Sequence, residues 1–141
     1  MTSPTADVPD APGRGGRILS IEDDASVRQF VTAVLKADGY DVSGAADGTA
    51  GIAAAKRELP DLILLDLILP YASGFDVLQR LREEPRTRAI PVLVLSTQGG
   101  EDDIVRALEI GAEDFLIKPF YARELVARVR KALSRARAGR A

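Results

Sequence analysis

The chain has 141 residues, no Cys, no His, 46% hydrophobic residues and a formal net charge of −2 at pH 7. This length predicts one domain, and the lack of Cys and His excludes disulfides, thiolate metal sites and mechanisms that need an imidazole. The charge balance argues against a dedicated nucleic-acid binder, and the sequence shows neither a membrane-length apolar run nor a signal-peptide layout, so we expect a cytoplasmic protein without membrane contact.

The first half of the chain alternates between short apolar runs and helical patterns. Residues 1–16 are rich in Pro, Gly, Ala and Asp, which predicts a disordered tail. After this tail, apolar runs predict strands, and apolar residues three and four positions apart predict helices. In the first helix these apolar residues are Val27, Phe30, Val31, Val34 and Leu35. The expected order is strand 18–22, helix 25–38, strand 40–45, helix 48–59 and strand 62–66.

The second half continues this alternation, with Gly111 expected to end one of its helices. Five strand–helix pairs in succession predict an α/β fold: a five-stranded, doubly wound parallel sheet with helices on both faces. The folded domain is expected over residues 17–135, followed by a basic tail over 136–141. The expected order here is helix 75–82, strand 90–96, helix 102–110, strand 115–117 and helix 121–137.

Polar side chains follow four of the five expected strands. Asp66 closes the apolar run 62–66, which is typical of a central strand buried on both faces. In open α/β sheets, chemistry collects at the carboxyl ends of the strands, which share one edge. The loops at that edge carry Glu22, Asp23 and Asp24, then Asp66, then Ser96 and Thr97, and finally Lys118 with Pro119. Such a cluster is hard to explain by core packing.

These residue types suit phosphoryl transfer. Neighbouring carboxylates repel one another, and a divalent cation relieves the repulsion. Glu22, Asp23 and Asp66, with a loop carbonyl and waters, would form an oxygen site suited to Mg²⁺. A carboxylate oxygen of Asp66 would attack a phosphoryl group in line, while Lys118 and Ser96 bind two of its oxygens.

Four motifs make the chain resemble a two-component response-regulator receiver domain over about residues 17–133. They are Ile21-Glu22-Asp23-Asp24, the run 60–70 around Asp66, the run 91–96 ending at Ser96, and the run 111–120 around Lys118-Pro119. Each motif alone is weak, but the four together, in order and at the proper strand ends, are specific. The resemblance implies the CheY-like, flavodoxin-like fold, with strand order 2-1-3-4-5 counted along the chain.

The resemblance also implies roles for the polar residues. Asp66 would be the phosphoacceptor and Lys118 its lysine partner, with a cis peptide before Pro119. Ser96 and Phe115 would be switch residues: the hydroxyl swings toward the phosphoryl group and the ring turns inward. The preferred interpretation of Phe115 is an ordinary core residue, whatever its switching role.

The implied metal is Mg²⁺, or Mn²⁺, held by Glu22, Asp23, Asp66 and the backbone carbonyl of Ile68. Glu22 stands where Asp is more familiar in the family, and it lengthens the reach to the metal by one methylene. Ile68 and Gln98 lie at positions that tune dephosphorylation in the family. An apolar Ile68 would hinder the attacking water.

The partners implied by the resemblance are a histidine kinase or phosphotransfer protein and a downstream protein. The output face would comprise the helix 102–110, the strand 115–117 and the helix 121–137. A chain that ends soon after this helix predicts a stand-alone switch. Mixed charges on the face resemble receivers of winged-helix transcription factors, which dimerise there when phosphorylated, although Ile104 stands where a basic residue is common. The candidate dimer residues are Arg106, Glu113, Asp114, Glu124 and Arg128.

Three alternatives stay open. A Mg²⁺-dependent phosphohydrolase with an Asp nucleophile would place a second Asp at position 68, where this chain has Ile. A receiver-like scaffold would bind partners without phosphorylation, which the intact set of polar residues disfavours. The last helix carries many cations against Glu124, and it is read either as a partner or nucleic-acid surface or, preferably, as a solvated face. These cations are Arg123, Arg128, Arg130, Lys131, Arg135, Arg137 and Arg140.

Overall fold

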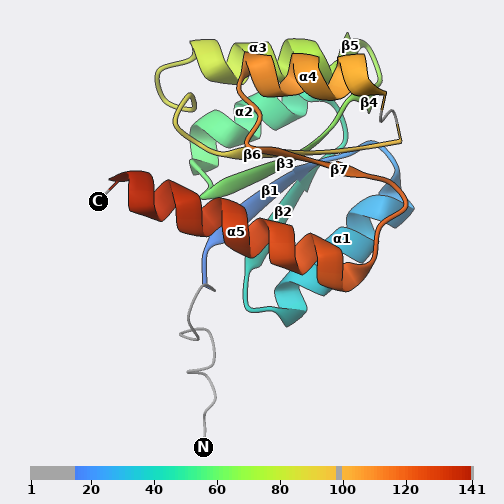
Figure 1. Cartoon of the computed structure of the whole chain (residues 1–141), viewed down its shortest axis with the longest axis vertical. Coiled ribbons are helices and arrows are strands. Elements are labelled where there is room, and N and C mark those ends of the chain that lie inside the picture. The colour runs from blue at the N-terminus through green and yellow to red at the C-terminus, as the bar shows by residue number, and fades with distance from the viewer. Residues whose placement is uncertain (1–14, 98–99, 141) are drawn as a thin grey trace, which may run out of the picture.

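Five parallel strands form the central sheet in a computed structural model that describes residues 15–97 and 100–140 (Figure 1). Their spatial order is β2-β1-β3-β6-β7. This confirms the expected order, because the additional strands β4 and β5 pair only with each other. The sheet strands are β1 (Arg17–Ile21), β2 (Asp41–Ala45), β3 (Leu62–Asp66), β6 (Val92–Ser96) and β7 (Asp114–Ile117).

Helices cover both faces of the sheet (Figure 1). One face carries α1 (Ala25–Ala37) and α5 (Ala122–Arg140), and the other carries α2 (Gly48–Glu58), α3 (Gly74–Glu83) and α4 (Glu101–Ile110). Side chains that alternate along β3 supply both cores: Leu62 and Leu64 pack on the side of α1 and α5, whereas Ile63 and Leu65 pack on the opposite side. Both faces of β3 are therefore buried, as its continuous apolar run predicts.

Two local features differ from the sequence prediction. The strand expected to begin at residue 90 begins at Val92, since the Ile90 carbonyl accepts a 2.6 Å hydrogen bond from Arg82 Nη2 and Pro91 has no N–H. A short hairpin, β4 (Ile68–Leu69) with β5 (Ala72–Ser73), follows β3 and was not expected.

The predicted domain bounds stay predictions at both ends of the chain. Most of the expected N-terminal tail, residues 1–14, lies outside the described residues. At the other end, α5 continues to Arg140, through most of the expected basic tail. Of the helices in the described ranges, none has the length and apolarity that a membrane span requires.

Gly74, at the start of α3, lies in close contact with the backbone at the end of β3. A β-carbon at this position would overlap the carbonyl oxygen of Asp66 and the Cα of Leu67. The side chain of Ser73 caps α3 by accepting a hydrogen bond from the N–H of Phe75 at 3.1 Å. Glycine at residue 74 therefore permits a close backbone approach next to Asp66.

Candidate functional site

Asp66 is the last residue of β3 and lies in the middle of the sheet, between β1 and β6. The residue is buried, with 6% of its surface exposed. One carboxylate oxygen accepts a hydrogen bond from the backbone N–H of Ile68 at 3.1 Å, and the other accepts one from Lys118 Nζ at 3.2 Å. The carboxylate is thus held by two donors from separate parts of the chain.

Lys118 joins the two buried acids of the site. It follows β7, and the peptide bond between Lys118 and Pro119 is cis, as expected. Its backbone N–H donates to the carbonyl of Ser96 at 2.9 Å, which fixes the lysine beside β6. Its Nζ lies 2.6 Å from Glu22 Oε1 and 3.2 Å from Asp66 Oδ2. One ammonium group therefore serves two carboxylates.

A third acid completes a cluster that could hold a metal ion. Glu22, Asp23 and Asp66 each offer a carboxylate oxygen, and these atoms lie within 4.8 Å of one another. The three carboxylates exceed the charge of Lys118 by two units, so the donor set fits a divalent cation with hard oxygen ligands. Asp24 is used differently: its side chain caps α1 by accepting hydrogen bonds from the N–H groups of Ser26 and Val27.

Burial and charge perturb the titration of this cluster. Burial raises the pKa of Glu22, and the nearby charge of Asp66 adds to this effect, while Lys118 opposes it. For Lys118, burial acts to lower the pKa, but the hydrogen bond that it donates to Glu22 and the charges of both acids outweigh this effect, so the pKa is raised. Lys118 therefore stays charged across the physiological range.

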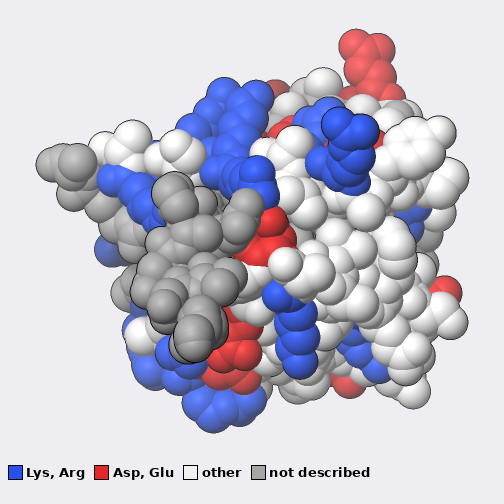
Figure 2. Space-filling view, turned by 90° about the horizontal axis from the view of Figure 1, so that it is seen from below, with Lys and Arg blue, Asp and Glu red and all other residues white. Residues whose placement is uncertain are grey.

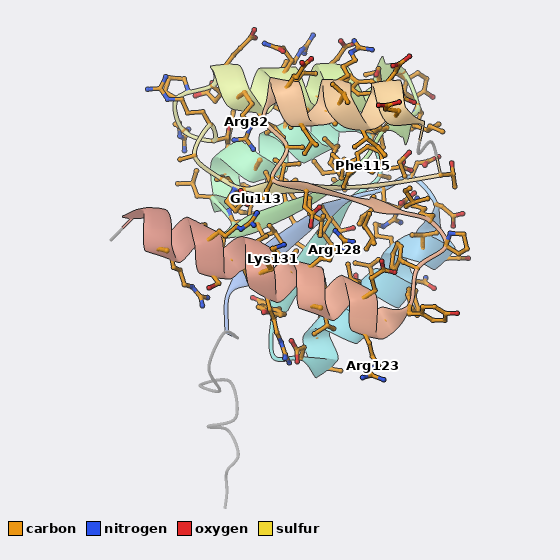
Figure 3. All side chains as sticks on the ribbon, in the orientation of Figure 1. Arg82, Glu113, Phe115, Arg123, Arg128 and Lys131 are labelled. Carbon is orange, nitrogen blue, oxygen red and sulfur yellow. The ribbon has the colours of Figure 1, made fainter. Side chains whose placement is uncertain are left out.

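The two predicted switch residues are both buried. Ser96 ends β6 with no exposed surface, and Phe115 in β7 is 8% exposed and belongs to the core beside α3 and α4. The ring of Phe115 points into the molecule (Figure 3), which agrees with its interpretation as a core residue. Their switching roles, and the use of the Ile68 carbonyl as a ligand, stay predictions. Gln98 lies outside the described residues.

An apolar groove borders the acidic cluster, and the sequence analysis did not identify it. Its cavity has a volume of about 450 Å³ and is lined by Ser26, Val27, Phe30, Thr97, Lys118, Pro119 and Phe120. The rings of Phe30 and Phe120 lie 6.3 Å apart, tilted by 44°. Phe30 is one of the apolar residues whose spacing predicts this helix, and it is 44% exposed. Helical spacing alone does not separate the edge of an apolar stripe from its buried centre.

The candidate dimer residues pair mainly with one another and with neighbours in the same chain. Both carboxylate oxygens of Asp114 accept from Arg128 Nη1, at 2.9 and 3.0 Å, and Arg128 also lies 3.8 Å from Glu124. Arg106 stacks over the ring of Phe75, 4.1 Å from its centroid. Their part in dimerisation remains a prediction.

Acidic partners offset much of the positive charge of α5. Arg130 lies 2.6 Å from Asp38, and Arg135 lies 3.3 Å from Glu113. The view from below shows groups of basic side chains with acidic ones between them (Figure 2). This mixture agrees with a solvated face.

Comparisons with known proteins agree with this geometry. Residues 18–130 match the family model of the response regulator receiver domain. The chain is 48% identical over 119 residues to the DNA-binding dual master transcriptional regulator RpaA of Synechocystis, covering 84% of this chain and 49% of that protein. It is 43% identical over 119 residues to the phosphate regulon transcriptional regulatory protein PhoB of Escherichia coli, covering 84% of this chain and 52% of that protein. The chain thus spans about half the length of these relatives.

A solved structure gives the same assignment. The receiver domain of the Francisella response regulator 1452 superimposes with a TM-score of 0.79 at 29% identity, covering 85% of this chain and 98% of that chain. The chain therefore belongs to the response regulator receiver domain family of two-component signalling, whose members typically act as regulators and partner histidine kinases.

Proposed function

We propose that this receiver accepts a phosphoryl group on Asp66 from a histidine kinase or phosphotransfer protein. The observation that carries this proposal is the contact of Lys118 with both Glu22 and Asp66 beside an acidic cluster suited to a metal. A carboxylate oxygen of Asp66 forms a bond to phosphorus as the bond from phosphorus to the donor's histidine nitrogen breaks, and that nitrogen takes up a proton. Lys118 then pairs with a phosphoryl oxygen, and Ser96 donates a hydrogen bond to another.

The residues proposed to hold Mg²⁺, or Mn²⁺, are Glu22, Asp23 and Asp66, with the backbone carbonyl of Ile68. When bound, the metal neutralises charge on the phosphoryl oxygens. Glu22 would hold the metal through a carboxylate oxygen. If this replaced its contact with Lys118, the ammonium group would be available to the phosphoryl group.

The phosphodonor is proposed to dock in the groove beside Phe30 and Phe120. This groove is largely apolar and includes Lys118 in its wall, so a partner seated there would bring its own reactive group close to Asp66. An exposed aromatic ring beside a reactive centre is typical of an interface anchor.

The output is proposed to pass through α4, β7 and α5 to a downstream protein or to a second copy of this chain. The coupling of this face to Asp66 is proposed to run along β7, which contains Phe115 and leads directly to Lys118. In a homodimer, Asp114 and Arg128 would exchange partners across the interface. The stand-alone arrangement stays a prediction.

The two alternative functions, a phosphorylation-independent scaffold and a phosphohydrolase, have less support. A scaffold that needs no phosphorylation would gain nothing from three acids and a lysine in one partly buried cluster, which costs desolvation energy. A phosphohydrolase of this kind would need a second Asp at position 68. This chain has an isoleucine there, and the residue is 49% exposed.

Amide chemical shifts of the full chain, recorded before and after treatment with a small phosphodonor and Mg²⁺, test the proposed switch. We expect changes at Asp66 and also along α4, β7 and α5, and none of them in Asp66→Asn. Changes confined to the surroundings of Asp66 would exclude this output face.

A further inference from the structure

A second cavity lies at the edge of the sheet opposite the acidic cluster. It has a volume of about 250 Å³ and is formed by residues that precede β6, residues that join α4 to β7, and the later half of α5. Because strands advance about 3.3 Å per residue, this cavity and Asp66 are separated by roughly the length of a five-residue strand. The side chains that matter here are Arg82, Arg88, Glu113 and Arg135.

Arg82 is a fixed part of the cavity wall. Its guanidinium group donates to the carbonyl of Arg88 and, at 2.6 Å, to that of Ile90. Its buried Nε has no hydrogen-bond partner among the residues that the structure describes. Gly111, with φ of 131°, lets this side chain pass close by, since a β-carbon there would lie 3.0 Å from Arg82 Cδ. Burial lowers the pKa of Arg82, and the charge of Glu113 only partly opposes this.

The other two arginines are available to a ligand. Arg88 is exposed, and its side chain makes no ion pair among the residues that the structure describes. Arg135 lies 3.3 Å from Glu113, but the two side chains are 58% and 28% exposed, so their pairing contributes little and is easily exchanged. Arg82 and Glu113 lie at the same end of the molecule (Figure 3). The cavity lining therefore contains three arginines and one carboxylate.

We propose that this cavity binds a phosphate group, as inorganic phosphate or as the phosphate of a small phosphomonoester, at a site separate from Asp66. Planar guanidinium groups match the oxygens of phosphate in pairs, and charge-assisted hydrogen bonds of this kind are strong. The volume lies below the range typical of drug-sized ligands, which favours a small anion. Glu113 competes with the anion for Arg135 and therefore weakens binding.

A titration of the isotope-labelled full chain with sodium phosphate, at constant ionic strength and without Mg²⁺, tests this proposal. Saturable amide shifts are expected at residues 88–90, 92 and 111–113 rather than around Asp66. The double variant Arg88→Ala, Arg135→Ala should raise the dissociation constant at least about fivefold, given the strength of charge-assisted hydrogen bonds. Glu113→Gln should lower the dissociation constant, since it removes the competing carboxylate.

Lys131→Ala is the matched control, because it removes a cation from the same helix outside the cavity lining. Unsaturable shifts, an equal loss in Lys131→Ala, or an unchanged affinity in Glu113→Gln would each overturn the proposal. A second titration, with a nucleoside monophosphate in place of inorganic phosphate, distinguishes the two possible ligands. Tighter binding than inorganic phosphate supports a phosphomonoester ligand, and equal or weaker binding supports free phosphate.

Discussion

Lys118 and Glu22 are 96 positions apart in the chain, yet their charged atoms lie 2.6 Å apart at the edge of the sheet. The same ammonium group contacts Asp66 at 3.2 Å. The side chains of all three residues are largely buried, with exposures of 13%, 4% and 7% for the lysine, the glutamate and the aspartate. This arrangement ties the stability of the fold to the chemistry of the site.

Replacement of the lysine should therefore destabilise the protein. In Lys118→Met, two buried carboxylates lose their only counter-charge in the described structure, and we expect a loss of about 2–4 kcal/mol in the free energy of unfolding. Urea denaturation measures this loss. Mg²⁺ should restore more stability to the variant than to the wild type, because the metal replaces the missing positive charge. Equal stabilisation of both proteins would contradict this account.

Glu22→Gln should stabilise the metal-free protein at neutral pH. Because the pKa of Glu22 is raised in the fold, its stabilising contribution is full below the ordinary value of 4.5 and is lost as pH rises through the folded value. The variant should be more stable than the wild type at about pH 7.5, and the difference should shrink toward about pH 4. Urea unfolding without metal at both pH values checks this difference.

The same titration should affect metal binding. Protonation of Glu22 removes a proposed ligand, and its raised pKa means that it takes up a proton at a higher pH than an ordinary carboxyl group does. As the pH is lowered, Mg²⁺ affinity should therefore begin to fall earlier than it would with a ligand of ordinary pKa. Calorimetric titrations across the acidic range measure this. A profile that matches a carboxyl group of ordinary pKa would show that Glu22 is not the titrating ligand.

Phe30→Ala should slow phosphotransfer from a histidine kinase but not from a small phosphodonor. An exposed aromatic anchor contributes about 1–2 kcal/mol to binding, which corresponds to roughly tenfold weaker docking. Val105→Ala is the matched control, since Val105 on α4 is also 44% exposed but lies away from the groove. Equal slowing in both variants, or with the small donor as well, would argue against docking in the groove.

Arg128→Ala should weaken any phosphorylation-dependent dimer by about tenfold, because it removes the cation that pairs with Asp114. Sedimentation analysis of the phosphorylated protein at several concentrations measures the dissociation constant. Arg123→Ala, on the same helix but without an ion pair in the described structure, serves as the control. A monomer at every concentration, with Asp66 phosphorylated, would leave a downstream protein as the partner of this face.

Much of the site follows from the sequence because parallel strands end at one edge of the sheet. Asp66 ends β3 and Lys118 directly follows β7, so their proximity at one edge of the sheet could be predicted without coordinates. The direct contact of Glu22 with Lys118 could not be predicted, since it depends on the conformations of two long side chains. The same limit applies to the pairing of Arg128 with Asp114.

Other features escape sequence patterns for different reasons. The β4–β5 hairpin has two residues in each strand, too few to show an alternation. The exposure of Phe30 depends on how α1 is rotated against α5, which helical spacing leaves open. The cavity at Arg82 draws its arginines from three separate segments, and no local motif joins them.

The mass of the intact protein after incubation with a small phosphodonor tests the central claim most directly. We expect one added phosphoryl group in the wild type with Mg²⁺, and none in Asp66→Asn or without the metal. An adduct that persists in Asp66→Asn would place the chemistry on another residue. The complete absence of an adduct, together with no binding of Mg²⁺, would contradict the phosphorylation switch and favour a scaffold.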